Sequence, residues 1–326
     1  MCTAITYKTK HHYFGRNLDL EYSYRESVTI TPRNYLFKFR KMGEMKNHYA
    51  MIGTAMVEED YPLYYDATNE KGLSMAGLLF AGNAVYQEVA EGKDNVSPFE
   101  FIPWVLGRCA DLEEVRVLLD RMNPVAIDFS NKYPLTELHW MISDRKGSIV
   151  VEAVSEGLKV YENPAEVLTN NPSFDMQMFG LNKYMSLSVE PAINHFSDKL
   201  DLKNYSRGMG ALGLPGDWTS PSRFVRAAFT RMNARSGNSE EESVSQFFHI
   251  LGSVEHPRGC VHMGEGKYEI TVYSSCCNTD EGIYYYKTYD NPNIIGIDMK
   301  KEDLEGSSLI SYPMIKKGCL NIQNAR

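Results

Sequence analysis

The sequence of 326 residues predicts an α+β fold in which helices pack on largely antiparallel β-sheet, with residues 1–326 forming one domain. The first third of the chain alternates apolar and polar residues with the period of two that strands require. Pairs of segments with helical spacing follow, and strand spacing returns near the C-terminus. No repeat, low-complexity linker or block of like charge marks a domain boundary.

The chain is predicted to begin with a β-hairpin. Residues 2–7 and 13–20 have strand spacing, and the polar residues between them are typical of a turn. Further strands are expected at residues 27–31, 49–57 and 73–80, separated by Gly, Asn and charged residues. The first third of the chain should therefore be mostly sheet.

Two helices in series are predicted next. Ser97-Pro98-Phe99-Glu100 offers an N-cap, a proline at the first helical position and a glutamate at the capping-box spacing. Asp111 followed by Glu114 repeats this signature, and apolar residues recur at helical spacing as far as Met122.

The second half is predicted to contain a hairpin, two more helices and three strands. Strands at 139–143 and 148–154 flank a turn, one helix begins at Ser220-Pro221, and another begins near Glu241. Strand spacing returns at residues 268–274, 283–289 and 294–299.

Composition excludes several classes of protein. With 43% apolar and 23% charged residues, the chain can build a sizeable core, so neither a disordered protein nor a disulfide miniprotein fits. A net charge of −8 repels phosphate backbones, which disfavours nucleic-acid binding. The sequence has no run of 18 apolar residues and no basic N-terminal segment that leads into an apolar one. We therefore expect a cytoplasmic protein without membrane insertion.

Cysteines and histidines do not form a metal or disulfide framework. The six cysteines contain no C-x-x-C pair, the eight histidines form no H-E-x-x-H, and Cys260-Val261-His262 lacks further ligands at zinc spacing. The segment Gly208–Gly213 fits G-x-G-x-x-G, but it neither follows a strand nor opens a helix, which favours a flexible loop over a dinucleotide site. No metal or cofactor is expected.

Cys2 is the residue with the clearest chemical meaning. If the initiator Met1 is removed, Cys2 carries a thiol and an α-amine on one residue. Because the reference pKa of the amine lies slightly below that of the thiol, the amine can accept the thiol proton near neutral pH. The alternative is that Cys2 is simply a small residue that begins a strand.

The predicted hairpin returns charged side chains to Cys2. A turn centred near Thr9-Lys10 places residues 15–17 beside it. The guanidinium of Arg16 would favour a thiolate, and Asp19 would orient the terminal ammonium or accept a hydrogen bond from it. The alternative for Arg16 and Asp19 is a surface ion pair of little energetic value.

Several segments spread along the chain together resemble one family. They are Cys2-Thr3-Ala4, residues 14–19, residues 69–73, Leu168-Thr169-Asn170-Asn171-Pro172, residues 214–217 and residues 222–226. With residues 97–104 and 284–286, the resemblance extends over essentially the whole chain. In these segments the sequence resembles the choloylglycine hydrolase family, and it is most similar to the bacterial bile salt hydrolases of that family.

The resemblance implies an N-terminal-nucleophile hydrolase with an αββα sandwich, in which two largely antiparallel sheets lie between helix layers. It makes Cys2 the nucleophile, with Arg16 and Asp19 as its electrostatic supports. Asn170 becomes an oxyanion donor, and Arg223 becomes a further charged support.

One position departs from the family. In the stretch that here reads Gly77-Leu78-Leu79-Phe80, bile salt hydrolases usually carry Asn and penicillin V acylases tend to carry Tyr, whereas this chain has Leu79. The backbone N–H attributed to the oxyanion site survives this substitution. The missing side-chain amide would affect substrate positioning.

The implied reaction is hydrolysis of the amide bond that joins a bile acid to glycine or taurine, through a thioester on Cys2. The steroid would contact Leu18, Phe129, Tyr133 and Leu138, although each of these apolar residues could equally belong to the core. Arg207 would pair with the carboxylate or sulfonate of the amino acid. The resemblance also implies a homotetramer.

Two other functions stay open. A penicillin V acylase would share the nucleophile, and Leu79 is the residue that keeps this alternative. A steroid-binding protein that has lost catalysis is disfavoured because Cys2, Arg16, Asp19, Asn170 and Arg223 are all present.

Overall fold

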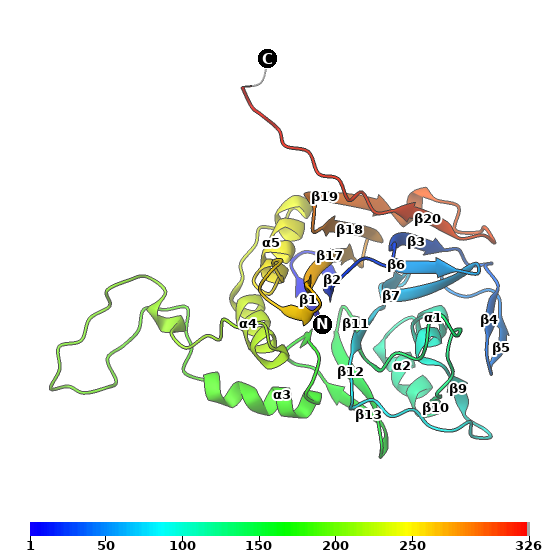
Figure 1. Ribbon diagram of the computed structural model, residues 1–326, viewed down its shortest axis with the longest axis horizontal. Coiled ribbons are helices and arrows are strands. Elements are labelled where there is room, and N and C mark those ends of the chain that lie inside the picture. Colours follow the sequence, from blue (N-terminus) through cyan, green and yellow to red (C-terminus); the bar gives the residue numbers. More distant parts are fainter. Residues whose placement is uncertain (325–326) are drawn as a thin grey trace.

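Two antiparallel sheets lie face to face between layers of helices in the computed structural model, which describes residues 1–324 (Figure 1). In spatial order, the first sheet contains β14 (Val167–Leu168), β1 (Cys2–Lys8), β2 (His12–Leu20), β17 (Ile270–Asn278), β18 (Ile283–Thr288) and β19 (Asn291–Asp298). The second contains β13 (Gly157–Glu162), β12 (Gly147–Val154), β11 (Leu138–Asp144), β8 (Ser74–Leu79), β7 (Tyr61–Asn69), β6 (Met51–Glu58), β3 (Ser27–Thr31) and β20 (Ile310–Pro313). The predicted α+β fold with largely antiparallel sheets is confirmed.

Helices cover the outer face of each sheet (Figure 1). The first sheet packs against α4 (Ser220–Asn233) and α5 (Glu240–Gly252), and the second against α1 (Phe101–Arg108) and α2 (Leu112–Leu119). The remaining helices are α3 (Phe174–Gly180), η1 (Pro98–Glu100), η2 (Leu181–Tyr184), η3 (Met209–Ala211) and η4 (Met299–Lys301). Small two-stranded sheets pair β9 (Asp94–Val96) with β10 (Met122–Pro124), β4 (Phe37–Phe39) with β5 (Gly43–Met45), and β15 (His262–Gly264) with β16 (Lys267–Tyr268).

The predicted helix starts agree with the structure to within a residue or two. Ser97 and Glu100 form the capping box in front of η1 and α1, and Asp111 caps α2 by accepting from two backbone N–H groups. The N-cap of α4 is Thr219, one residue before the predicted Ser220.

Several elements, β7 and α3 among them, were not predicted from sequence spacing. The strand β7 contains Pro62 and the buried Asp66, which both break the apolar alternation that identifies a strand. The helix α3 has only seven residues, too few to establish a helical period.

The hairpin β1–β2 has a register one residue away from the predicted one. Cys2 pairs with Leu18 and Ala4 pairs with Arg16, so residues 15–17 are not directly beside Cys2. Residues directly opposite each other in an antiparallel pair share a face, and a shift of one residue reverses that face. The observed register therefore places Cys2 and Arg16 on the same face, toward the second sheet.

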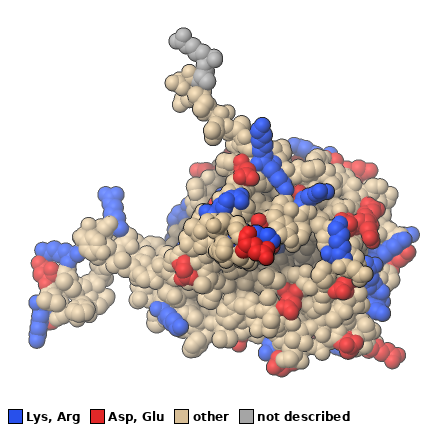
Figure 2. All heavy atoms as spheres, viewed as in Figure 1, with Lys and Arg blue, Asp and Glu red and all other residues tan. Residues whose placement is uncertain are grey.

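An arm of residues 185–216 leaves the body between η2 and α4 (Figures 1 and 2). Large apolar side chains on this arm are exposed, including Met185, Phe196 and Tyr205, each more than 80% accessible. The glycine motif 208–213 includes the half-buried η3 and neither follows a strand nor opens an α-helix, as predicted. Within residues 1–324, none of the helices has the length and apolar character needed to cross a bilayer.

Candidate active site

Cys2 is the first residue of β1, and two distant side chains hold its main chain. Its N–H donates to Oδ1 of Asn170 over 2.8 Å, and Nη1 of Arg223 donates to its carbonyl oxygen over 2.5 Å. Through Nη2, Arg223 also donates to the same Asn170 oxygen over 2.8 Å. All three residues are buried. The structure thus brings Cys2 together with two residues that lie far away in the sequence.

Asn170 also connects the two sheets. Its Nδ2 donates over 2.7 Å to the carbonyl oxygen of Leu79, the last residue of β8. Leu79 is 38% exposed, whereas Asn170 is buried. The two groups predicted to stabilise an oxyanion are therefore neighbours, at the edge of the sheets where Cys2 lies.

A buried polar pair fixes the residues adjacent to this edge. Nε2 of His139 donates to the carbonyl oxygen of Thr169 over 2.9 Å, and its Nδ1 lies 3.2 Å from Oε1 of Glu152. The ring of Phe80 stacks on the imidazole with centroids 4.4 Å apart. His139 is thus a buried histidine whose ring nitrogens both have polar partners.

The guanidinium of Arg16 lies between the two sheets. Nη1 donates to the carbonyl oxygens of Gly77 (2.6 Å) and Tyr65 (2.9 Å), and Nη2 has no hydrogen-bond partner among the described residues. Burial opposes the charge, but the ionisable groups nearby, Cys2 first, raise the pKa of Arg16 above its ordinary value. A permanent positive charge with a free N–H is thus available to a thiolate.

Asp66, which the sequence analysis did not identify, is the acidic neighbour of Arg16 between the sheets. Oδ1 accepts from the hydroxyl of Tyr273 (2.7 Å), and Oδ2 accepts from Tyr284 (2.6 Å) and Ser275 (3.3 Å). Burial raises the pKa of Asp66, and Arg16 together with these hydroxyl donors opposes that shift. Because its two oxygens accept three hydrogen bonds, the network fits an ionised carboxylate.

Asp19 lies on the opposite face of β2, toward α4. Its Oδ1 accepts from Oγ1 of Thr271 over 2.6 Å, and its Oδ2 lies 3.9 Å from Nη1 of Arg223. Burial raises the pKa of this carboxyl, and Arg223 is the strongest influence against that shift. Burial also lowers the pKa of Arg223, with Asp19 opposing it. The Asp19 side chain is thus a partner of Arg223.

The terminal ammonium, on Met1 in this structure, contacts a different acid. It forms an ion pair with the carboxylate of Glu269 and donates to the backbone oxygen of Asp19 over 2.6 Å. Glu269 is 1% exposed and directly precedes β17, the strand next to β2. No motif marks Glu269, and no signal in the sequence could have placed it beside the N-terminus.

The predicted steroid contacts form two groups. Leu18 is buried opposite Cys2, and Leu138 pairs with Leu79 on the neighbouring strand β11. The rings of Phe129 and Tyr133 lie 6.3 Å apart in the segment that leads into β11.

Arg207 is not brought to this site. It is exposed on the arm, and within residues 1–324 its side chain shares no hydrogen bond or ion pair with the residues around Cys2. The geometry of one chain therefore gives Arg207 no place at the nucleophile.

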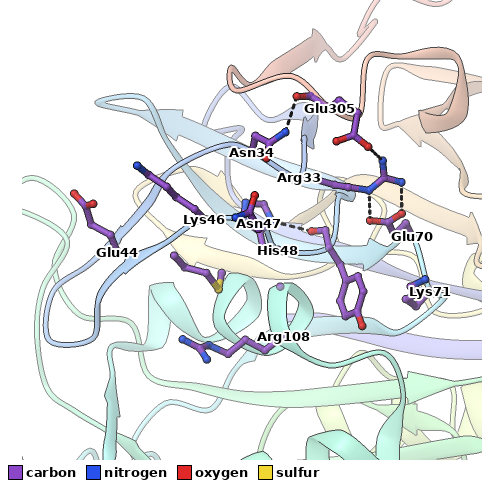
Figure 3. Close-up of a pocket in the computed structure, with 13 residues that line it drawn as sticks. Arg33, Asn34, Glu44, Lys46, Asn47, His48, Glu70, Lys71, Arg108 and Glu305 are labelled. Atoms are coloured by element: carbon purple, nitrogen blue, oxygen red, sulfur yellow. Dashed lines mark hydrogen bonds and ion pairs between the residues drawn. The ribbon is translucent and has the colours of Figure 1, made fainter.

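A groove of about 750 Å³ lies elsewhere, between the β4–β5 hairpin and the end of α1 (Figure 3). Within it, Arg33 bridges Glu70 and Glu305. None of the predicted site residues lines this groove. Among residues 1–324, no cluster of three or more His, Cys, Asp or Glu side chains is arranged to hold a metal ion.

Comparison with known proteins gives a consistent picture. Residues 2–312 match the family described as linear amide C-N hydrolases, choloylglycine hydrolase family. A bile salt hydrolase/transferase of Lactiplantibacillus plantarum is 56% identical over 96% of this chain and 97% of its own. Another from Clostridium perfringens is 41% identical over 99% of this chain and 100% of its own.

Solved structures are similar over the same length. A conjugated bile acid hydrolase variant from Clostridium perfringens superposes with a TM-score of 0.91 at 40% identity, covering 99% of this chain and 100% of that one. Penicillin V acylase from Agrobacterium tumefaciens shares the fold, with a TM-score of 0.75 at 21% identity, covering 95% of this chain and 90% of that one.

Proposed function

Since the chain belongs to the choloylglycine hydrolase family of linear amide C–N hydrolases, we propose that it cleaves the amide bond of bile acids conjugated to glycine or taurine, with Cys2 as nucleophile. The observation that carries this proposal is the convergence of Arg16, Asn170 and Arg223 on Cys2. The relatives named as bile salt hydrolases support the choice of substrate.

The first half of the reaction forms a thioester. After Met1 is removed, the α-amine of Cys2 takes the proton from Sγ, and the thiolate attacks the amide carbonyl carbon. The side chain of Asn170 and the backbone N–H of Leu79 stabilise the oxyanion, and the positive charge of Arg16 stabilises the thiolate. The C–N bond then breaks, and the leaving glycine or taurine takes the proton from the α-ammonium.

The second half of the reaction hydrolyses the thioester. The α-amine takes a proton from water, and the resulting hydroxide attacks the acyl carbon. The C–S bond breaks, the bile acid leaves, and the proton returns to the sulfur of Cys2. No cofactor takes part in these steps.

For the substrate, we propose that Leu18 and Leu138 contact the steroid nearest the nucleophile and that Phe129 and Tyr133 contact it further away. Leu18 and Leu138 lie beside Cys2 and Leu79, respectively, which supports this order. An apolar body with few polar anchors is the kind of ligand that such side chains bind.

The direct test compares wild type with Cys2→Ala on taurocholate and glycocholate. We expect wild type to release taurine or glycine and to gain the mass of the bile acyl group as a covalent adduct. Cys2→Ala should do neither. Failure of wild type to release an amino acid, while it binds bile salt as tightly as Cys2→Ser does, would instead show a steroid-binding protein.

Penicillin V acylase activity is the second candidate, because Leu79 replaces the Asn usual in bile salt hydrolases and exposes an apolar side chain at the oxyanion edge. Hydrolysis of penicillin V is measured on the same preparation. Faster turnover of penicillin V than of either bile salt would favour this candidate.

We further propose that the chain assembles as a homotetramer. The exposed apolar side chains of the arm support association, since monomeric proteins rarely present extended apolar surface to water. In such an assembly Arg207, which lies outside the site of its own chain, would contact the substrate bound to another copy.

A further inference from the structure

A buried acid that the mechanism above does not use lies at the N-terminus. The ammonium of Met1 binds the carboxylate of Glu269, and the backbone oxygen of Asp19 completes the contact at 2.6 Å. Glu269 is almost completely buried, and its Oε2 has no hydrogen-bond partner within the described chain. Burying a carboxylate is costly unless a charge compensates it, and here the compensating charge is the N-terminus itself.

A histidine lies between Glu269 and Asp19. Nδ1 of His256 is 3.8 Å from Oε2 of Glu269, and its Nε2 is 3.9 Å from Oδ2 of Asp19. Both distances exceed a hydrogen bond, and neither ring nitrogen has a partner in residues 1–324. Burial, and then the charge of Arg223, lowers the pKa of His256 to about 3, so the ring is neutral near pH 7. His256 thus supplies no counter-charge to Glu269.

We propose that Glu269 is a positioning residue for the α-amine of the mature chain, an inference that rests on the proposed function. Three covalent bonds separate the nitrogen of Met1 from that of Cys2, a span of about 4 Å at most. Removal of Met1 therefore creates the new ammonium close to the carboxylate that binds the old one. Glu269 then contacts this ammonium directly or through a water molecule in the place that Met1 occupied.

The other charges near this amine explain why a carboxylate is needed. The ionisable groups are Arg16 and Asp19 on β2, Asp66 on β7, Arg223 and Arg226 on α4, Tyr273 on β17, and His256. The arginines disfavour an ammonium beside them, while Asp19 already faces Arg223 and Asp66 lies near Arg16 between the sheets. Glu269 is the acid whose carboxylate contacts the N-terminal ammonium.

The charge on Glu269 acts at one point in the reaction. When the proton moves from Sγ of Cys2 to the α-amine, an ammonium and a thiolate form together. Glu269 stabilises the ammonium and so raises the pKa of the amine, which makes the amine a stronger base. The proton passes on to the leaving amino acid, and Glu269 itself transfers no proton.

Glu269→Gln tests this role, because it removes the charge and keeps the size of the side chain. We expect the acidic limb of the pH profile of kcat/KM for taurocholate to move to lower pH by about one unit, since the amine loses its proton more easily. The plateau rate should fall several-fold because the base is weaker. A purely structural role would lower the rate at every pH without moving the limb.

The matched control is Glu255→Gln. Glu255 also carries a partly buried carboxylate near β17, but it pairs with Lys287 rather than with the N-terminus. We expect its profile to keep the wild-type limb. Glu269→Asp retains the charge but places it one methylene further away, so it should give an intermediate shift of the acidic limb. This variant replaces Glu269→Gln in the test if the Gln variant fails to fold.

A second measurement does not depend on turnover. In a Cys2→Ala background with Met1 removed, the rate of reductive methylation of the α-amine is followed against pH by mass spectrometry, with and without Glu269→Gln. We expect the amine pKa to fall by about one unit with the Gln substitution. Equal titration curves would overturn the role of Glu269 even if bile salts are hydrolysed, and a shifted curve would support it even if they are not.

Discussion

The guanidinium of Arg223 shows how single residues build the site. It donates to the carbonyl oxygens of Trp218 and Cys2, to Oγ1 of Thr3 and to Oδ1 of Asn170. Such a set of contacts requires the planar fork of arginine and several donors in fixed directions. The position of the nucleophile therefore depends on a residue of α4 that never needs to touch the substrate.

Asn170→Ala should lower kcat by about 10²- to 10³-fold, which is the usual loss when one oxyanion donor is removed. The overall fold should persist, since the substitution leaves the surrounding strands intact. The control is Asn171→Ala, which removes only an exposed hydrogen bond to Ala81. Kinetics on taurocholate with circular dichroism provide the comparison, and a loss of similar size in both variants would contradict a specific role for Asn170.

The buried side chain of His12 should make the free energy of unfolding depend on pH. Burial lowers the pKa of His12 to about 4, whereas an unfolded histidine has a pKa near 6.5. The unfolded chain therefore binds a proton at His12 more readily than the folded chain does. The contribution of neutral His12 to the free energy of unfolding is thus fully present above about pH 6.5 and is lost as pH falls toward 4. The loss at pH 4 is about 3 kcal/mol at most.

Urea unfolding of wild type and His12→Asn at pH 7 and pH 4.5 checks this prediction. Asparagine cannot take up the proton, so the free energy of unfolding of the variant should depend less steeply on pH. If both proteins lose the same stability between the two pH values, the prediction for His12 is wrong.

At the scale of elements, the hairpin β1–β2 was predictable because both strands are local in sequence and their turn lies between them. Its register was not, because a turn of one more or one fewer residue fits the same pattern and moves Arg16 from one face to the other. Glu269 and Asp66 could not be found at all from spacing. They reach the site through strand pairings and sheet packing between segments far apart in sequence.

Close packing between β2 and β17 makes Gly15 a sensitive position. A Cβ atom at Gly15 would lie 2.0 Å from the backbone oxygen of Ser275, so the strands would have to separate. We expect Gly15→Ala to lower the free energy of unfolding by about 1–3 kcal/mol. The control Gly147→Ala has no atom within 4 Å of the new methyl group, and urea unfolding of the two should differ accordingly.

At the scale of the whole molecule, the residues of the site come from both sheets, from α4 and from the loop that follows β14. The family resemblance, and not composition or periodicity, identified this combination in the sequence. The single domain and the cytoplasmic location stay predictions. On the face seen in Figure 2, acidic and basic side chains are interspersed over the body, so no field of one sign directs a charged partner there.

A charged substitution in the arm should dissociate the proposed homotetramer. Phe196→Asp places a charge on a side chain that is 82% exposed in one chain and that a partner copy would bury. We expect light scattering after gel filtration to show dissociation of a tetramer. Val117→Asp, on the exposed face of α2, is the control and should leave the mass unchanged. A monomeric wild type would contradict the proposed assembly directly.

The ion pair between the Met1 ammonium and Glu269 has a practical consequence for producing this enzyme. Any affinity tag fused before Met1 would replace that ammonium with an uncharged peptide group, and the tag would have to leave the body past buried residues. It would also keep the α-amine of Cys2 blocked. The opposite end runs outward from β20 in an exposed, extended segment (Figure 1). Purification handles therefore belong at the C-terminus.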